Sequence, residues 1–380
     1  MNLRMVHILE EQKTKWSFKM KINQFSPYLG DEEYKKIKEC FDSNWITEGP
    51  LCAEFSDKLL KLTGAKYGVF APNGTLALYL ALKAAGIKPG DEVLVSNFTF
   101  IASANAIEMI GATPVFVDIN MDLHINIEHA EELITEKTTG IMPIHIYGTA
   151  CDMDSIMSFA KKHNLKVIED AAQAIGVHWN GKHCGTFGDI GTFSFFADKT
   201  ITTGEGGFVV TNNEEIYENL LYIRNQGRIN RGSFLHPQIG YNFRITDLQA
   251  AVGLAQISKL PEIIEKKMNI FNSYMKKIKN KDFCILEPHE KSGFVPFRVA
   301  LFYKHNVNDL MKYLSDNGIE TRTFFYPLHN QPCFVSKNWI RSEYKNSIYA
   351  YDHGLCMPSY VSLSEEEIEY VCDRLNNYVV

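Results

Sequence analysis

Short apolar segments and helical patterns alternate along the chain between about residue 65 and residue 212. Seven of the segments are apolar almost throughout: YGVFAP, DEVLVSN, TPVFVDI, GIMPIHIYG, LKVIED, IGTFSFF and GGFVVT. Such runs are typical of strands buried on both faces, and the patterns TLALYLALKAAG, IASANAIEMIGA and DSIMSFAKKHN supply covering helices. We therefore predict a three-layer α/β domain with a mixed, mostly parallel seven-stranded sheet.

The pattern changes after Leu260-Pro261. A helical run, IIEKKMNIFNSYMKKIKN, leads to the apolar segment VPFRVALFY, and two helical patterns follow, VNDLMKYLSDNG and SEEEIEYVCDRLNNYV, the second with Ser364 as its N-cap. This order predicts a smaller α+β domain that meets the large domain at a helical hinge. The expected division is an N-terminal extension at residues 1–21, a large domain at 22–260 and a small domain at 261–380.

The composition argues against several classes of protein. A chain of 380 residues that is 45% hydrophobic has enough apolar surface for a folded core, and its net charge of −6 predicts no binding to nucleic acid. We find no apolar leader and no stretch long enough to span a membrane, so we expect a cytoplasmic protein. The eight cysteines form no C-x-x-C pair and no compact Cys/His spacing, which predicts neither a metal site nor a disulfide framework.

Motifs of several common enzyme classes are missing from the sequence. GEGGFV at 204–209 lacks the third glycine of a dinucleotide-binding fingerprint, and no G-x-x-x-x-G-K-[ST] occurs. H-E-x-x-H and G-x-S-x-G are also absent, so a zinc peptidase and an α/β-hydrolase have no support in the sequence.

The segment Asn73-Gly74-Thr75 follows a predicted strand and opens a predicted helix. The N-terminus of a helix presents unpaired N–H groups and a positive dipole end, Gly74 allows close approach, and the Thr75 hydroxyl adds a donor. Such a segment can hold a phosphate. The alternative is an ordinary helix cap, which the segment alone does not exclude.

Asp170, in VIEDAAQA, ends a predicted buried strand at the edge where open α/β sheets place their ligands. A carboxylate there needs a partner, and a protonated ring nitrogen of a cofactor supplies one. Gln173 lies three residues further on and can reach the same ligand. The alternative for Asp170 is a helix-capping role.

Lys199 follows the strand GTFSFF and precedes the glycine-rich turn TTGEGG. A lysine amine in a desolvated pocket loses its proton more easily and can attack a carbonyl to form a Schiff base. Ser194, five residues earlier on the strand, can reach a phosphate. The turn by itself is also compatible with a surface hairpin, but a phosphate cradle, a strand-end aspartate and a Schiff-base lysine on one sheet together predict a pyridoxal 5′-phosphate (PLP) site.

At these residues the chain also resembles the DegT/DnrJ/EryC1/StrS family of nucleotide-sugar aminotransferases, whose fold is the aspartate aminotransferase-like (PLP-dependent type I) fold. The resemblance extends over nearly the whole chain from about residue 22. The blocks that carry it are WITEGP (45–50), NGTLALYLAL (73–82), TFIASANAIEMIGATPVFVDI (99–119), HIYGTACDM (145–153), IEDAAQAIG (168–176), TFSFFADKTITTGEGG (192–207), RNQG (224–227), GYNFRITDLQAAVGLAQ (240–256) and ETRTFFYPLH (320–329).

The resemblance implies a role for each residue that matches these blocks. Lys199 is implied to bind the cofactor as a Schiff base, and Asp170 to hold the proton on the ring nitrogen. The other implied cofactor ligands are Gln173 near the ring hydroxyl, Phe100 on the ring face, and Gly74, Thr75 and Ser194 at the phosphate.

A homodimer with shared active sites is also implied, with Asn242 reaching the cofactor phosphate of the neighbouring subunit. His329, Arg244 and Trp45 are weaker candidates for the sugar pocket, since each is equally compatible with a structural role.

Two blocks depart from the family pattern. Ala197-Asp198 precedes the lysine where relatives often have Gly-Asn, and Gln226 stands where His is common. Neither change removes a required group. A subgroup of similar dehydratases carries His at the lysine position, so Lys199 argues against that deoxygenating chemistry.

Within the family, TITTGEGG resembles the loop of the enzymes that aminate C4 of 4-keto-6-deoxy sugars. The implied substrates are L-glutamate and a nucleotide-linked 4-keto-6-deoxyhexose, with GDP-4-keto-6-deoxymannose, the precursor of GDP-perosamine for a surface glycan such as the O-antigen of lipopolysaccharide, as the first choice. One alternative keeps the chemistry but uses a UDP- or dTDP-linked sugar. The others are a regulator that binds PLP or a nucleotide sugar without turnover, and a PLP lyase or decarboxylase.

Overall fold

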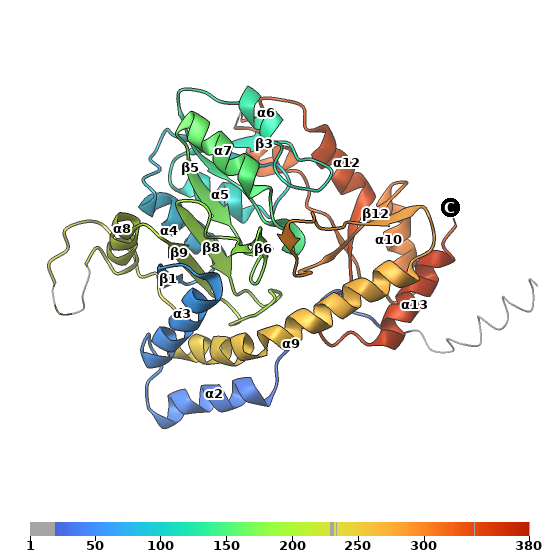
Figure 1. Cartoon of the computed structure of the whole chain (residues 1–380), viewed down its shortest axis with the longest axis horizontal. Helices are drawn as coiled ribbons and strands as arrows, with labels where there is room; N and C mark the ends of the chain where they lie inside the picture. The colour runs from blue at the N-terminus through green and yellow to red at the C-terminus, as the bar shows by residue number, and fades with distance from the viewer. Residues whose placement is uncertain (1–19, 229–231, 233, 338, 380) are drawn as a thin grey trace, which may run out of the picture.

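The computed structural model of the chain describes residues 20–228, 232, 234–337 and 339–379. Of the N-terminal extension predicted at residues 1–21, residues 1–19 therefore lie outside the described part. The large sheet has the order β1-β9-β8-β5-β4-β2-β3 (Figure 1). Its strands are β1 (Tyr67–Ala71), β2 (Glu92–Ser96), β3 (Thr113–Val117), β4 (Thr138–Met142), β5 (Lys166–Asp170), β8 (Ile190–Ser194) and β9 (Gly207–Thr211).

Each of the seven predicted apolar segments contains one strand of this sheet. Strand β9 runs antiparallel to both of its neighbours, β1 and β8, and the remaining pairs are parallel. The predicted mixed, mostly parallel α/β sheet is thus confirmed.

Side chains on the strands alternate between two hydrophobic clusters, which is why the strands are apolar throughout. Val93 and Val95 pack with one cluster, for example, while Leu94 between them packs with the other. Helices α4 (Gly74–Ala84), α5 (Ala102–Met109) and α8 (Glu214–Arg224) contribute to the first cluster. Helices α3 (Pro50–Thr63), α6 (Ile127–Glu132), α7 (Met153–His163) and the first part of α9 (Asp247–Lys277) contribute to the second.

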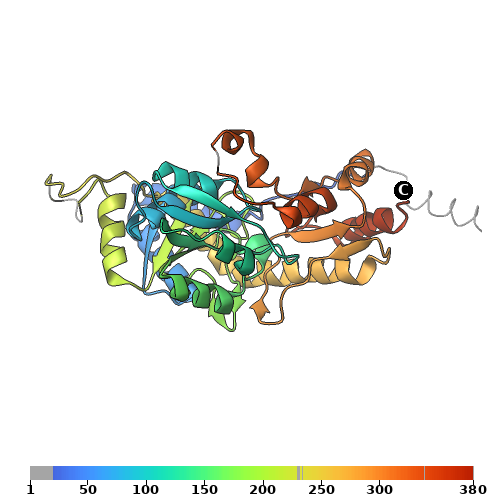
Figure 2. The ribbon, with the colours of Figure 1, turned by 90° about the horizontal axis from the view of Figure 1, so that it is seen from above.

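Helix α9 runs from the large sheet to the C-terminal part of the chain (Figure 2). The domain boundary predicted at Leu260-Pro261 lies inside this helix, which continues through Pro261 because Leu260 and Ile263 on either side are buried. The start of α9 packs against α2 (Asp31–Asp42) and α3, and α9 also packs against α13 (Glu365–Asn376).

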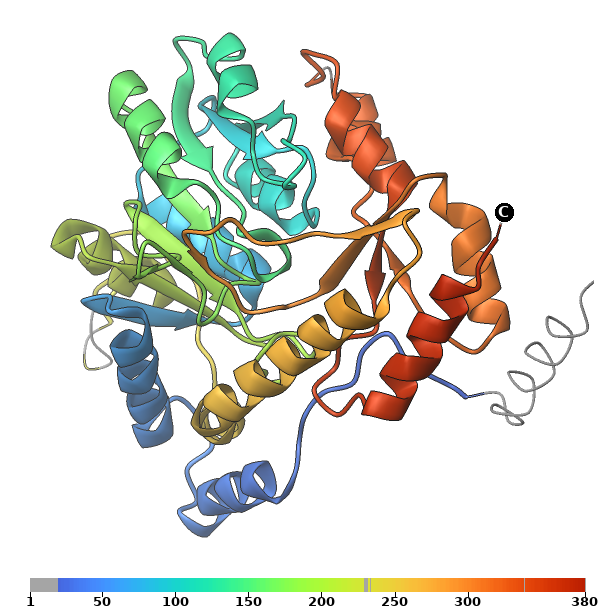
Figure 3. The ribbon, with the colours of Figure 1, turned by 45° about the vertical axis from the view of Figure 1, so that its right-hand side comes forward.

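The C-terminal part contains a four-stranded antiparallel sheet of order β10-β12-β14-β13 (Figure 3). Its strands are β10 (Phe283–Ile285), β12 (Val299–Tyr303), β13 (Arg322–Thr323) and β14 (Gly354–Met357), accompanied by α10 (Val307–Asp316), α12 (Lys345–His353) and α13. A separate hydrophobic cluster joins β10, β12, β14, α10 and α13 to the end of α9. Ser364 caps α13 as predicted, in a reciprocal pair with Glu367.

The remaining elements are short. They are a three-stranded sheet of β11 (Ser292–Gly293), β6 (His178–Trp179) and β7 (Lys182–His183), the 3₁₀ turns η1 (Ile146–Gly148) and η2 (Leu328–Asn330), and α11 (Pro332–Val335). All eight cysteines are free. Within the described ranges, no helix is long and apolar enough to cross a membrane, and no group of three or more His, Cys, Asp or Glu side chains is arranged to hold a metal ion.

Candidate active site

The predicted cofactor ligands meet at the carboxyl ends of the central strands. Asp170 is the last residue of β5, Ser194 is the last residue of β8, and Gly74 opens α4 directly after β1. Lys199 follows β8 and lies close enough to Asp170 for that carboxylate to raise the pKa of the lysine. The sheet therefore brings together groups that are up to 125 residues apart in sequence.

Gly74 packs closely against Ser194. A Cβ atom on Gly74 would lie 2.9 Å from Ser194 Cβ and 3.0 Å from its Oγ, so only a glycine fits there without a shift of its neighbour. Asn73 caps α4 by accepting a hydrogen bond of 2.9 Å from the Leu76 N–H, and Thr75 stands in the first turn. Gly74 and Ser194 thus meet at the positive end of the helix, a place suited to a phosphate.

The Asp170 carboxylate is buried and has two partners. Its Oδ2 accepts a hydrogen bond of 2.8 Å from Ser103 Oγ on α5, and its Oδ1 accepts one of 3.1 Å from the Ala172 N–H. Both bonds stabilise the charged form and leave acceptor capacity for a protonated ring nitrogen. Sequence reasoning missed Ser103, although it lies only three residues after Phe100 in the same block.

Gln173 is buried, and its amide orientation is set by the backbone. The Tyr147 N–H donates a hydrogen bond of 2.8 Å to Gln173 Oε1. Tyr147 has a positive φ of 51°, an uncommon conformation for a residue with an aromatic side chain. The bond leaves the NH₂ group as the donor that Gln173 can offer to a ligand such as a ring hydroxyl oxygen.

The Lys199 amine lies 4.8 Å from the centre of the Phe297 ring. Burial lowers the pKa of this amine, the carboxylates of Asp198 and Asp170 oppose that effect, and the guanidinium groups of Arg298 and Arg322 add to it. A lowered pKa increases the fraction of neutral amine, the form that attacks a carbonyl.

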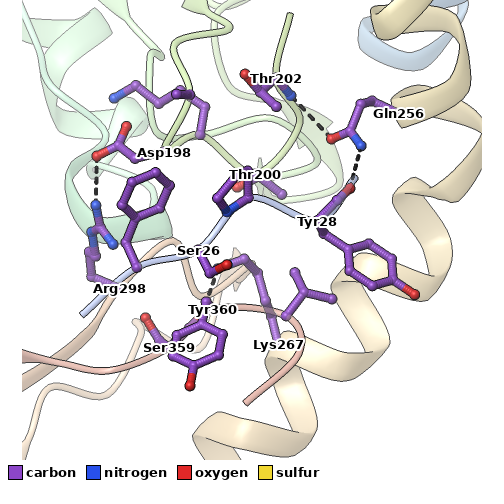
Figure 4. Close-up of a pocket in the computed structure, with 15 residues that line it drawn as sticks. Ser26, Tyr28, Asp198, Thr200, Thr202, Gln256, Lys267, Arg298, Ser359 and Tyr360 are labelled. Atoms are coloured by element: carbon purple, nitrogen blue, oxygen red, sulfur yellow. Dashed lines mark hydrogen bonds and ion pairs between the residues drawn. The ribbon is translucent and has the colours of Figure 1, made fainter. Parts of the chain in front are cut away.

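Asp198, next to Lys199, pairs with two arginines of the small sheet. Arg298 Nη2 lies 2.6 Å from Asp198 Oδ2 (Figure 4). Arg322 Nη1 lies 3.5 Å from the same oxygen. The sequence analysis noted Asp198 as a departure but missed both arginines. No motif marks them, because only the approach of the small sheet to the Lys199 turn brings them there.

Phe100 and Trp45 are exposed aromatic residues, with 60% and 46% of their surface accessible. Phe100 follows β2, and its ring centre lies 6.5 Å from that of Phe325. Its open ring is available to stack on a planar cofactor. Trp45 lies against Gly49, where a Cβ atom would collide with the indole.

Asn242 and Arg244 lie in the chain between α8 and α9, and Asn242 forms an isolated antiparallel bridge with Asn225, the residue that follows α8. Arg244 Nε donates a hydrogen bond of 2.7 Å to Asn242 Oδ1. The adjoining Tyr241 bonds through its backbone to Gln226 and Ile223. Their predicted roles at a neighbouring cofactor and in the sugar pocket stay predictions.

His329 is buried and held by Asn97, which follows β2. Its Nδ1 lies 2.8 Å from Asn97 Nδ2, its N–H donates to Asn97 Oδ1 at 2.9 Å, and its ring packs on Tyr344 with centroids 4.5 Å apart. Burial lowers the pKa of His329, and Asp118 opposes that shift. The histidine thus has a structural role, and its contribution to a sugar pocket stays a prediction.

Comparison with known proteins decides what kind of site this is. Residues 27–376 match the DegT/DnrJ/EryC1/StrS aminotransferase family. The chain belongs to this family. It is 41% identical over 364 residues to the GDP-perosamine synthase of Escherichia coli O157:H7, a match that covers 93% of this chain and 97% of that protein. It is 36% identical over 363 residues to the GDP-perosamine synthase of Vibrio cholerae, covering 93% and 98%.

Solved structures of aminotransferases have the same fold as this chain. The PLP form of the sugar aminotransferase Spr1654 from Streptococcus pneumoniae superposes with a TM-score of 0.90 at 25% identity, covering 94% of this chain and 98% of that one. Helicobacter pylori PseC, an aminotransferase of pseudaminic acid biosynthesis, gives 0.89 at 26% identity, covering 94% and 98%. The predicted family, fold, cofactor and aminotransferase activity are confirmed.

The site geometry fits PLP. Gly74 and Ser194 meet at the positive end of α4, where a phosphate can bind, the Asp170 carboxylate keeps acceptor capacity for a ring N–H, and Lys199 is close enough to Asp170 for that charge to act on its amine. The chain is a PLP-dependent aminotransferase.

Proposed function

We propose that this aminotransferase moves the amino group of L-glutamate to C4 of GDP-4-keto-6-deoxymannose, giving GDP-perosamine. The observation that carries the proposal is the identity of 41%, 36% and 37% to three proteins named GDP-perosamine synthase, each matched over at least 97% of its length. The proposed setting is a cytoplasmic step in the biosynthesis of a surface glycan such as the O-antigen.

Bound PLP withdraws electrons from the carbon that carries the amino group. Asp170, supported by Ser103, keeps the proton on the ring nitrogen, because a buried carboxylate favours a cationic partner. The Lys199 amine takes the proton from Cα of the donor and delivers it to C4′ of the cofactor, and it reverses this transfer for the sugar. Gly74, Thr75 and Ser194 hold the phosphate so that both half-reactions occur at one lysine.

L-Glutamate brings two carboxylates, which require a cation near Lys199. Arg322 supports L-glutamate as the amino donor, because its side chain is 55% exposed and its guanidinium is close enough to act electrostatically on the Lys199 amine. A guanidinium binds a carboxylate through two parallel hydrogen bonds.

The enzyme is proposed to work as a homodimer with shared sites. Three apolar side chains of the segment beyond α8, Phe234, Leu235 and Ile239, are 89%, 75% and 82% exposed, although water is an unfavourable environment for them. Asn242 lies at the end of this segment, where it would reach a neighbouring subunit. We propose that a second copy of the chain packs on these exposed apolar side chains.

A spectroscopic experiment tests the function. The absorption band of lysine-bound PLP is expected to disappear when L-glutamate is added to the purified enzyme, and to return when GDP-4-keto-6-deoxymannose follows. Matched cuvettes receive dTDP- or UDP-linked 4-keto-6-deoxyglucose. Return of the band only with one of those sugars would overturn the GDP assignment and leave the aminotransferase intact. Full turnover by Lys199→Ala would overturn the mechanism.

A further inference from the structure

Asp198 connects two parts of the chain that the sequence separates by 100 residues. It lies in the turn that carries Lys199, after the end of β8. Its main partner, Arg298, stands immediately before β12 of the small sheet, and a weaker partner, Arg322, lies on β13. Figure 4 shows the Asp198 carboxylate facing the Arg298 guanidinium.

The Asp198–Arg298 ion pair is shielded from water. The side chain of Arg298 is 5% exposed and that of Asp198 is 12% exposed, whereas that of Arg322 is 55% exposed. Burial lowers the pKa of Arg298, and the Asp198 charge opposes that shift. A charge buried to this degree is costly without its partner, so each member requires the other.

Both members of the pair also act on Lys199. Both cations contact the Phe297 ring. The Arg298 guanidinium carbon lies 4.6 Å from the ring centre, and the Lys199 amine lies 4.8 Å from it. The charged groups that act on this amine come from four places: Asp198 in its own turn, Asp170 at the end of β5, Arg298 before β12, and Arg322 on β13. Lys267 of α9 lines the same small pocket beneath the turn.

The charges around Lys199 are balanced only while Asp198 is ionised. Two carboxylates then oppose two guanidinium groups. Replacing Asp198 by a neutral residue leaves one carboxylate, Asp170, and two guanidinium groups near the Lys199 amine. Replacing Arg298 by a neutral residue leaves two carboxylates and one guanidinium group, that of Arg322. The two substitutions thus act on the amine in opposite directions.

We propose that Asp198 is a positioning residue that, through its ion pair with Arg298, fixes the Lys199 turn against the small sheet and sets how readily the Lys199 amine reacts. The inference rests on the proposed role of Lys199 in amino transfer. It assigns a task to the Asp198 side chain at a position where similar enzymes often have the neutral Asn.

The test measures how fast cofactor-free protein binds PLP, from the absorbance of the lysine-bound cofactor, at a series of pH values. The rate follows the neutral fraction of the Lys199 amine, so its midpoint reports the pKa of that amine. We expect Asp198→Asn to move the midpoint down by about one pH unit and Arg298→Gln to move it up by about one unit. The double variant Asp198→Asn/Arg298→Gln is expected to return to within a few tenths of a unit of the wild-type value.

A purely structural ion pair gives a different result. It predicts that both single variants bind PLP more slowly at every pH, without midpoint shifts of opposite sign, and that outcome overturns the proposal. Asp282→Asn serves as the matched control, because it removes an exposed aspartate of the small domain whose partner Lys304 lies 3.6 Å away. We expect its midpoint to equal that of the wild type.

The double variant keeps the proposal falsifiable if a single variant does not fold, because it removes both charges of the buried pair, and the Arg322 side chain, which loses its contact with Asp198, is 55% exposed. A double variant that folds, as judged by circular dichroism, and keeps a midpoint shifted by one unit would overturn the charge balance. The proposed function fails separately: wild-type protein that forms no lysine-bound cofactor at any pH contradicts the role of Lys199 itself.

Discussion

The Ser103 hydroxyl on α5 donates a hydrogen bond of 2.8 Å to Oδ2 of Asp170 at the end of β5. This bond joins a helix on one face of the sheet to the carboxylate that is to hold the cofactor ring. A hydrogen bond to a charged group contributes about 1.5–3 kcal/mol, which makes Ser103 the clearest supporting residue of the site.

Ser103→Ala is therefore expected to reduce kcat by roughly tenfold while PLP still binds, because an Asp170 with one partner fewer holds the ring proton less firmly. Steady-state kinetics with saturating L-glutamate and the sugar measure this effect. Ser273→Ala is the control, since the hydroxyl of that half-buried serine of α9 donates to Glu365, in the C-terminal part of the chain. Equal kcat values for Ser103→Ala and wild type would contradict the role of Ser103.

Gly74→Ala is expected to weaken PLP binding by at least about tenfold and to leave the fold intact. The new Cβ would lie 2.9 Å from Ser194 Cβ, so Gly74 and Ser194, the two residues proposed to hold the phosphate, would have to move apart. Equilibrium dialysis with PLP gives the affinity. Gly30→Ala is the matched control, because a Cβ there meets only the flexible Glu32 side chain, at 3.4 Å. Unchanged affinity in Gly74→Ala would place the phosphate elsewhere.

Glu169, the neighbour of Asp170, is a fully buried carboxylate with a structural task. It accepts hydrogen bonds from three backbone N–H groups, those of Gly185, Phe187 and Gly188, and pairs with His145 at 3.0 Å. Glu169→Ala is expected to lower the free energy of unfolding by about 3–5 kcal/mol, because the three N–H groups lose their partner.

Urea denaturation of the cofactor-free protein measures the effect of Glu169→Ala. Glu131→Ala removes an exposed acidic residue that pairs with Lys162 and His163, and we expect it to leave the free energy of unfolding almost unchanged. Similar losses in the two variants would argue against the buried network.

Lys267 makes the stability depend on pH. Burial and, to a smaller extent, the Arg298 charge lower its pKa to about 7 against the opposing charge of Asp198. The amine donates hydrogen bonds to the carbonyl oxygens of Ser359 and Phe297. Because this pKa lies below the value of 10.5 for an unfolded chain, the unfolded state binds more protons between about pH 7 and 10.5. The free-energy cost of burying the charged Lys267 amine is therefore largest at pH 7 and below, and it decreases as the pH rises.

Lys267→Met is accordingly expected to raise the free energy of unfolding at pH 7 by roughly 1–3 kcal/mol, the loss of two hydrogen bonds to carbonyl oxygens offsetting part of the gain. At pH 9.5 the gain is expected to be smaller. Urea denaturation at both pH values tests this. A gain that grows with pH would show that the lysine is charged in the folded state.

Much of the fold was predictable because its signals are local. Each buried strand of the large sheet is a run of apolar residues, and the N-caps Asn73 and Ser364 are recognised from a few neighbouring residues. The division into two domains after residue 260 stays a prediction. The helix expected where the two domains meet is α9, which continues through Pro261 with Leu260 and Ile263 buried on either side.

The site divides in the same way. Gly74, Asp170 and Lys199 each stand at the junction of a strand with a turn or helix, and because the carboxyl ends of parallel strands meet at one edge, their order along the chain already predicts a shared pocket. That reasoning yielded the cofactor, and the resemblance to a family yielded the reaction type.

The sequence by itself thus determined the α/β sheet and the PLP cofactor, and it predicts Lys199 as the reacting lysine, since each depends on patterns within a few residues or on strand order. Only the tertiary structure decided which groups surround Lys199 and Asp170. Ser103, Arg298 and Arg322 reach the site through packing of a helix and of a second sheet against the first. The physical reason is that the pKa of a buried group depends on charges a few ångströms away, and separation in sequence does not reveal that distance.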